Sequence, residues 1–167
     1  MRCATVTSTA GTTAAAWKDG EWRALPAPDL SSLLRSGTEW ELGDAVAGAV
    51  PVLPLPTAGK VICCGLNYGD HIAETGRETP THPTLFAKYA DTLIGPTDDI
   101  TVPAGLEVDW EAELAVVVGG TLKNASPAEA QRAIAGYTVA NDISMRAWQF
   151  RALSWRLSKG QPNVVAL

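Results

Sequence analysis

The chain has 167 residues, of which 46% are apolar and 19% charged; this suffices for one packed domain with a small appendage and excludes a disordered chain. The net charge of −5 argues against nucleic-acid binding, which requires clustered Lys and Arg. No apolar run reaches the roughly 20 residues of a membrane helix, and the N-terminus lacks an apolar stretch of signal-peptide length, so we expect a cytoplasmic protein without a membrane partner.

Residues 1–50 are expected to form a small α+β domain. The stretch RCATVTS is extended, and AAAWKDGEWRAL predicts a hairpin that turns at Asp19-Gly20. LSSLLRSG predicts a short helix with Asp29 or Ser31 as its cap and Gly37 at its end. Three prolines in the following AVPVLPLPTAGK exclude regular structure and predict a stiff connector at residues 51–59.

Residues 60–167 are expected to form the second domain, rich in strands. KVICCG, LFAKYADTLIG, VDWEAELAVVVGG (residues 108–120) and GYTVANDIS predict strands, and NYGDHIAE allows a helical turn. SPAEAQRAIA predicts a capped helix with Ser126 at the N-cap, Pro127 in the first turn and Glu129 closing a capping box.

Acidic residues alternate along the strand at 108–120. Glu111 and Glu113 would share one face about 7 Å apart, so either a positive group or water must lie beside them. Asp142 adds a third carboxylate near the end of a second strand. Three carboxylates suit Mg²⁺ or Mn²⁺ rather than zinc. The competing interpretation is a set of exposed acidic residues on a half-solvated strand, and the pattern alone favours that interpretation.

His71 and Glu74 form a second candidate site. On a helical turn, positions i and i+3 face the same way, so the carboxylate can orient the imidazole as a general base for water. The same spacing is found in surface His and Glu pairs on solvated turns, and the spacing alone favours that interpretation.

The remaining reactive or bulky residues are interpreted as structural. Cys3, Cys63 and Cys64 form no disulfide framework and show no zinc spacing, so we expect buried, reduced thiols. Trp110 is expected to pack on the opposite face of its strand from Glu111. Arg146 is expected to pair with acidic residues.

Four ordered motifs together resemble the fumarylacetoacetate hydrolase family: KVICCGLNYGDHIAETG, PTLFAKYADTLIGP, VDWEAELAVVVG and AGYTVANDISMRAWQ. The resemblance covers roughly residues 58–159. It implies a mixed β / α+β fold, namely an incomplete β-roll of that family's type preceded by the small N-terminal α+β domain that many bacterial members carry.

The resemblance also implies site residues, matched position by position. An ExE pair and a later Asp imply that Glu111, Glu113 and Asp142 bind Mg²⁺ or Mn²⁺, with the LAVVV stretch beyond them in the core. The HxxE motif implies a catalytic dyad on a short lid helix, and the family further implies a catalytic lysine and two substrate-binding residues. These positions are His71 and Glu74 for the dyad, Lys159 for the catalytic lysine, and Lys88 and Gln149 for substrate binding.

The resemblance implies a metal-dependent hydrolase that cleaves a C–C bond in 2-oxo or diketo acids such as acylpyruvates, working as a homodimer. The alternative that it leaves open is an isomerase or decarboxylase acting on 2-hydroxyhepta-2,4-diene-1,7-dioate.

The sequence departs from the family pattern in two places. Ala147 stands where members usually carry Asp, and after Lys159 the chain reads GQPNVVAL where members continue through a longer segment that completes the β-roll. Two hypotheses follow: an active enzyme, complete or completed by a partner chain, or a truncated, catalytically inactive homologue that still binds Mg²⁺ weakly.

Overall fold

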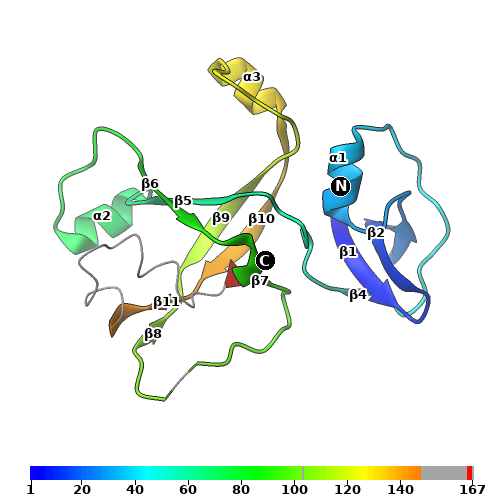
Figure 1. Ribbon diagram of the computed structural model, residues 1–167, viewed down its shortest axis with the longest axis horizontal. Coiled ribbons are helices and arrows are strands. Elements are labelled where there is room, and N and C mark those ends of the chain that lie inside the picture. Colours follow the sequence, from blue (N-terminus) through cyan, green and yellow to red (C-terminus); the bar gives the residue numbers. More distant parts are fainter. Residues whose placement is uncertain (103, 148–164, 167) are drawn as a thin grey trace.

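The computed structural model describes residues 1–102, 104–147 and 165–166, the last two by their backbone. Its first sheet has the order β3-β2-β1-β4 and comprises β1 (Arg2–Ser8), β2 (Gly11–Lys18), β3 (Glu21–Ala24) and β4 (Val50–Pro51). Helix α1 (Leu30–Ser36) packs against this sheet (Figure 1). The core between them contains apolar side chains of β2, α1 and the loop that joins β3 to α1, among them Ala14, Ala16, Leu25 and Leu33.

The predicted turn and helix ends of this part are confirmed. Asp19 and Gly20 have φ angles of 51° and 87°, the pair of positive values that a tight hairpin turn requires, and Lys18 faces Glu21 across it. Of the two predicted caps for α1, the structure selects Asp29, whose carboxylate accepts from the Ser32 N–H at 2.8 Å.

The connector contains one piece of regular structure, so the expectation of none was wrong there. Val50 and Pro51 pair with Thr7 and Val6 of β1 as a short edge strand. Proline is compatible with this position because the outer side of an edge strand needs no ladder hydrogen bond.

The second part of the chain is built from short sheets. β5 (Val61–Gly65) pairs with β6 (Thr84–Lys88), and helix α2 (Gly69–Thr75) lies between them in sequence. β7 (Leu93–Ile94), β12 (Val165–Ala166), β10 (Ile134–Asp142) and β9 (Ala112–Val118) form a four-stranded sheet in that order, and the 3₁₀ turn η1 (Ala90–Thr92) precedes β7. β8 (Val108–Asp109) pairs with β11 (Ser144–Met145).

The strand predicted at 108–120 is interrupted at Trp110 and Glu111, although both pieces keep one antiparallel register. Asp109 faces Ser144 on one side of the break and Ala112 faces Asn141 on the other. At the break, side chains accept from the backbone N–H groups, since the Glu111 N–H donates to Asn141 Oδ1 at 3.2 Å and the Trp110 N–H to Asp109 Oδ1 at 2.9 Å. Polar side chains close to the backbone compete with sheet hydrogen bonds in this way.

The face of β9 and β10 that points away from the site is exposed, so the expectation that LAVVV is core was wrong for alternate residues. Leu114, Val116 and Val118 are 61%, 48% and 59% exposed, and Val139 and Tyr137, which face the first two across the strands, are 71% and 62% exposed. Trp110 is 70% exposed and does not pack as an anchor. The sheet is thus half-covered in the described part of the chain.

The expectation that the three cysteines are buried, reduced thiols is confirmed in part. Cys3, Cys63 and Cys64 are all free, but only Cys63 is buried. Burial raises the pKa of the half-buried Cys3 thiol, and the nearby N-terminal ammonium opposes that shift. Among the described residues, no helix has the length and apolarity to cross a membrane.

Helix α3 (Pro127–Arg132) connects β9 to β10 and begins with the predicted capping box. Ser126 Oγ accepts from the Glu129 N–H, and the Glu129 carboxylate accepts from the Ser126 N–H at 2.8 Å and its hydroxyl at 2.7 Å. These hydrogen bonds to the ionised carboxylate lower the pKa of Glu129. In Figure 1, α3 lies at the far end of the β9–β10 hairpin from β8 and β11.

Replacing Ser126 with Ala should therefore raise the pKa of Glu129 towards its ordinary value. Because the folded-state pKa is the lower one, the contact stabilises α3 above the pKa of the unfolded chain, and that contribution is lost as pH falls through the folded value. An NMR titration of the Glu129 carboxyl measures the shift, with Thr121→Ala as a control in the same loop. An unchanged Glu129 pKa in Ser126→Ala would contradict this account.

Candidate metal centre

The centre is formed where β9 and β10 meet β8 and β11. In the common register Glu111 faces Asp142, and the Asp142 N–H donates to the Glu111 carbonyl at 2.8 Å. Residues on the same face of an antiparallel pair lie close together, so Glu113, two residues further on, is diagonal to Asp142. The pairing of the two strands therefore brings all three predicted carboxylates to one face.

Asp142 is the most deeply placed of these groups, with an exposed fraction of 0%. Lys88, at the end of β6 and 4% exposed, donates from Nζ to Asp142 Oδ1 and lies 3.5 Å from the Ile143 carbonyl. Burial of a carboxylate is costly unless a cation and hydrogen bonds compensate it. Lys88, predicted to bind substrate, is thus in contact with a predicted metal ligand.

Glu113 and Asp142 lie beside a thiol that the sequence did not predict in a site. One ligand atom each from Cys63, Glu113 and Asp142 lie within 4.8 Å of one another. Ligands about 2.0–2.3 Å from one ion are at most roughly 4.6 Å apart, so side-chain rotations would let these three atoms reach a common cation. The donor set therefore fits a divalent ion.

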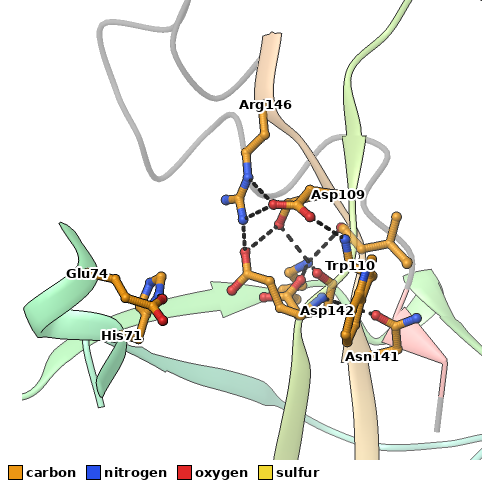
Figure 2. A network of polar contacts seen from close by, with 11 residues as sticks. His71, Glu74, Asp109, Trp110, Asn141, Asp142 and Arg146 are labelled. Carbon is orange, nitrogen blue, oxygen red and sulfur yellow. Dashed lines mark hydrogen bonds and ion pairs between the residues drawn. The ribbon is translucent and has the colours of Figure 1, made fainter. Parts of the chain in front are cut away.

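Glu111 is held differently from Glu113. Its Oε1 lies 2.9 Å from Arg146 Nη2 and accepts from the Ser144 hydroxyl at 3.1 Å. Arg146 also donates to Asp109 Oδ2, from Nε at 2.9 Å and from Nη2 at 2.7 Å (Figure 2). The arginine joins the two acids, as the sequence analysis expected, and Glu111 is not part of the 4.8 Å group.

Charged side chains of both signs gather at this end of the hairpin. Four carboxylates gather there, and the described residues include two cations in contact with them; the acids are Asp109, Glu111, Glu113 and Asp142, and the cations Lys88 and Arg146. A divalent cation bound here would add positive charge beside these acids.

The predicted dyad lies on α2, to one side of the carboxylates in Figure 2. His71 Nδ1 and Glu74 Oε2 are 4.0 Å apart, and the side chains are 55% and 78% exposed. This is an ion-pair distance and is too long for a hydrogen bond. Tyr68, the N-cap of α2, ties the helix to β9, since its hydroxyl oxygen accepts from the Leu114 N–H at 3.1 Å.

Sequence reasoning missed Cys63 as a neighbour of the carboxylates and Lys88 as the partner of Asp142. Both face inward from the β5–β6 hairpin, where Cys63, Phe86 and Lys88 are buried. Strand alternation in the sequence predicts that such residues share a face but not which groups they meet there. Gln149 and Lys159 lie outside the described residues.

Comparison with known proteins identifies the class of this chain. Residues 60–167 match the model for the fumarylacetoacetate hydrolase C-terminal domain. The chain belongs to the fumarylacetoacetate hydrolase family.

Individual relatives agree with this assignment. A human mitochondrial oxaloacetate tautomerase is 40% identical over 127 residues, which are 69% of this chain and 40% of the relative. The structure of 5-carboxymethyl-2-hydroxymuconate delta-isomerase from Mycobacterium smegmatis has a TM-score of 0.80 and 29% identity, covering 99% of this chain and 64% of the other. That of 2-hydroxyhepta-2,4-diene-1,7-dioate isomerase from Mycobacterium marinum has a TM-score of 0.77 and 28% identity, covering 99% and 63%.

These matches confirm the predicted family and fold class. The chain spans less than half of the curated tautomerase and about two thirds of the solved isomerases. The β-roll described here is accordingly incomplete relative to those solved chains.

Replacing Lys88 with Met should destabilise the fold by about 3–5 kcal/mol, because the wholly buried Asp142 would lose its ammonium partner. Urea unfolding in the presence of EDTA measures the change without stabilisation by bound cations. The exposed Lys60→Met is the matched control. The double variant K88M/D142N should recover much of the loss, and a K88M chain as stable as the parent would refute the compensating role of Lys88.

Proposed function

We propose that this chain forms the metal-binding part of an enzyme that hydrolyses a C–C bond in 2-oxo or diketo acids of the acylpyruvate type. The observation that carries the proposal is the convergence of Glu113 and Asp142, with Cys63, within 4.8 Å of one another at the buried end of the β9–β10 hairpin. Membership of a family that includes hydrolases and isomerases supports the reaction class.

The proposed cofactor is Mg²⁺ or Mn²⁺, held by Glu111, Glu113 and Asp142. When bound, it supplies positive charge where the oxygens of a 2-oxo-carboxylate gain negative charge during reaction. For Glu111 to join the other two, its carboxylate must rotate while it keeps Arg146 as a partner. The 2.9 Å contact with Arg146 uses Oε1, and a carboxylate has two oxygens with which to serve two partners.

The surrounding residues fix the ligands in place. Lys88 holds Asp142 from within the protein, and Ser144, which is 1% exposed, donates to Glu111. Such supporting groups orient metal ligands, and their loss typically weakens metal binding about 10–100-fold. Gln149 and Lys159 remain the proposed contacts of the substrate oxygens.

We propose that His71 and Glu74 move the proton. In hydrolysis His71 would accept a proton from the attacking water while Glu74 steadies the imidazolium. Their exposure on α2, which starts beside β9 through Tyr68, is consistent with a dyad that approaches the carboxylates when substrate binds.

A second candidate reaction is isomerisation or decarboxylation of a 2-hydroxy-dienoate, or tautomerisation of a 2-oxo acid. The observation that favours it is the identity of the similar proteins, two of which are named as isomerases and one as an oxaloacetate tautomerase. The same carboxylates and proton-transfer dyad would serve it, since both reactions need charge stabilisation at the 2-oxo group.

The purified chain with Mg²⁺ should reduce the absorbance of an acylpyruvate, and Glu113→Gln should lower kcat/KM by at least about 100-fold, because it removes a charged ligand. Glu107→Gln is the matched control, as Glu107 is an exposed carboxylate just before β8. Assay of a 2-hydroxy-dienoate and of oxaloacetate enol in parallel distinguishes the candidate reactions. No turnover of any of them, with or without metal, would favour the inactive homologue.

If the dyad transfers the proton, His71→Gln should lower kcat by about 10²–10⁴-fold while the affinity for the metal stays unchanged. Glu74→Gln should have a smaller effect in the same direction. The control is Glu78→Gln, an exposed carboxylate four residues further along the chain. Stopped-flow rates and metal titrations provide the two readouts, and equal rates in His71→Gln and the parent would exclude the dyad.

A further inference from the structure

Cys63 is a buried thiol that lies close to two carboxylates. It lies on β5 opposite Phe86 of β6, is 8% exposed, and is one of the three residues whose ligand atoms are within 4.8 Å of one another. The other two are Glu113 on β9 and Asp142 on β10. Three separate strands thus bring a thiol and two carboxylates together.

The neighbouring cysteine provides a natural contrast. Successive side chains of a strand point to opposite faces, so Cys64 shares its face with Ile62, which is 58% exposed, while Cys63 points inward. Cys3 belongs to the first sheet, on β1. Among the free cysteines only Cys63 is placed at the candidate metal centre.

We propose that Cys63 is a sulfur ligand of the divalent cation held by Glu113 and Asp142. The proposal rests on the proposed metal site and extends it. On binding, the S–H bond breaks, the proton passes to water, and the thiolate forms a bond to the metal without any change of oxidation state. The result is a mixed sulfur–oxygen site, in contrast to the all-oxygen shell that the motif implies.

The consequence is a preference among metals. Thiolate is a soft ligand that selects Zn²⁺ and similar ions, whereas Mg²⁺ takes oxygen ligands. The site should bind Co²⁺, Zn²⁺ and Cd²⁺ through the sulfur, and Mg²⁺ through the carboxylates alone. The contact of Lys88 with Asp142 is compatible with ligation, since it uses Oδ1 and a carboxylate has a second oxygen.

The experiment uses Co²⁺ and Cd²⁺ as probes of the full chain, because thiolate ligation of either ion produces ultraviolet charge-transfer absorption. The variant C3S/C64S, which keeps Cys63 as its one cysteine, should retain the band at one ion per chain. Cys63→Ser should lose the band and bind Cd²⁺ at least about 10-fold more weakly, with its Mg²⁺ affinity within about 2-fold of the parent. Cys64→Ser is the matched control and should behave as the parent does.

Equilibrium dialysis of Co²⁺ against the parent and Glu113→Gln tests the metal site separately from the sulfur ligand. If Co²⁺ binds in a Glu113-dependent manner but without a sulfur band, the role of Cys63 is refuted and the metal site stands. If no Glu113-dependent binding occurs, the proposed function fails together with this inference. A band that survives in Cys63→Ser also overturns the proposal.

A second measurement covers the case in which Cys63→Ser does not fold. X-ray absorption of the parent chain loaded with one equivalent of Zn²⁺ should show a sulfur neighbour at about 2.3 Å, and a first shell of nitrogen and oxygen alone would refute the thiolate ligand. Circular dichroism of each variant establishes that it is folded before its metal affinity is compared.

Discussion

The burial of the Asp142 carboxylate is the constraint on which this part of the molecule depends. A wholly buried anion at the end of β10 requires a cation, and Lys88 supplies it from the end of β6. The pair therefore joins the β5–β6 hairpin to the β9–β10 hairpin. Because Lys88 and Cys63 both project inward from that first hairpin, the same contact that neutralises Asp142 carries a thiol to the carboxylates.

Glu111 and Glu113 have different partners, although their spacing in the sequence suggests equivalent roles. Both follow the alternation of one strand, yet the strand is interrupted at Trp110 and Glu111, whose backbone N–H groups donate to side chains. Glu111 turns to Arg146 and Ser144, and Glu113 remains with Asp142. Arg146 thus offsets the repulsion between the closely spaced Asp109 and Glu111, and a divalent cation bound by Glu113 and Asp142 would do the same for that pair.

The apolar outer face of β9 and β10 is the other unusual feature. Leu114 and Val116 face Val139 and Tyr137 across the strands, and all four are exposed. Exposed apolar patches of this kind mark surfaces that contact other parts of a protein or a partner. The solved relatives are longer than this chain, which covers 64% of the Mycobacterium smegmatis isomerase.

Local signals in the sequence determined the turn at Asp19-Gly20, the capping box at Ser126, the positions of most strands and the family, because each depends on residues adjacent in the chain or on ordered motifs. For α1 the sequence left Asp29 and Ser31 as alternative caps, and the structure selected Asp29. The tertiary structure alone decided that Lys88 pairs with Asp142, that Cys63 joins Glu113 and Asp142, and that the LAVVV stretch is half exposed. These outcomes depend on how separate hairpins pack and which face is covered. A strand's alternation specifies two faces, and only packing decides which of them is buried and what it meets there.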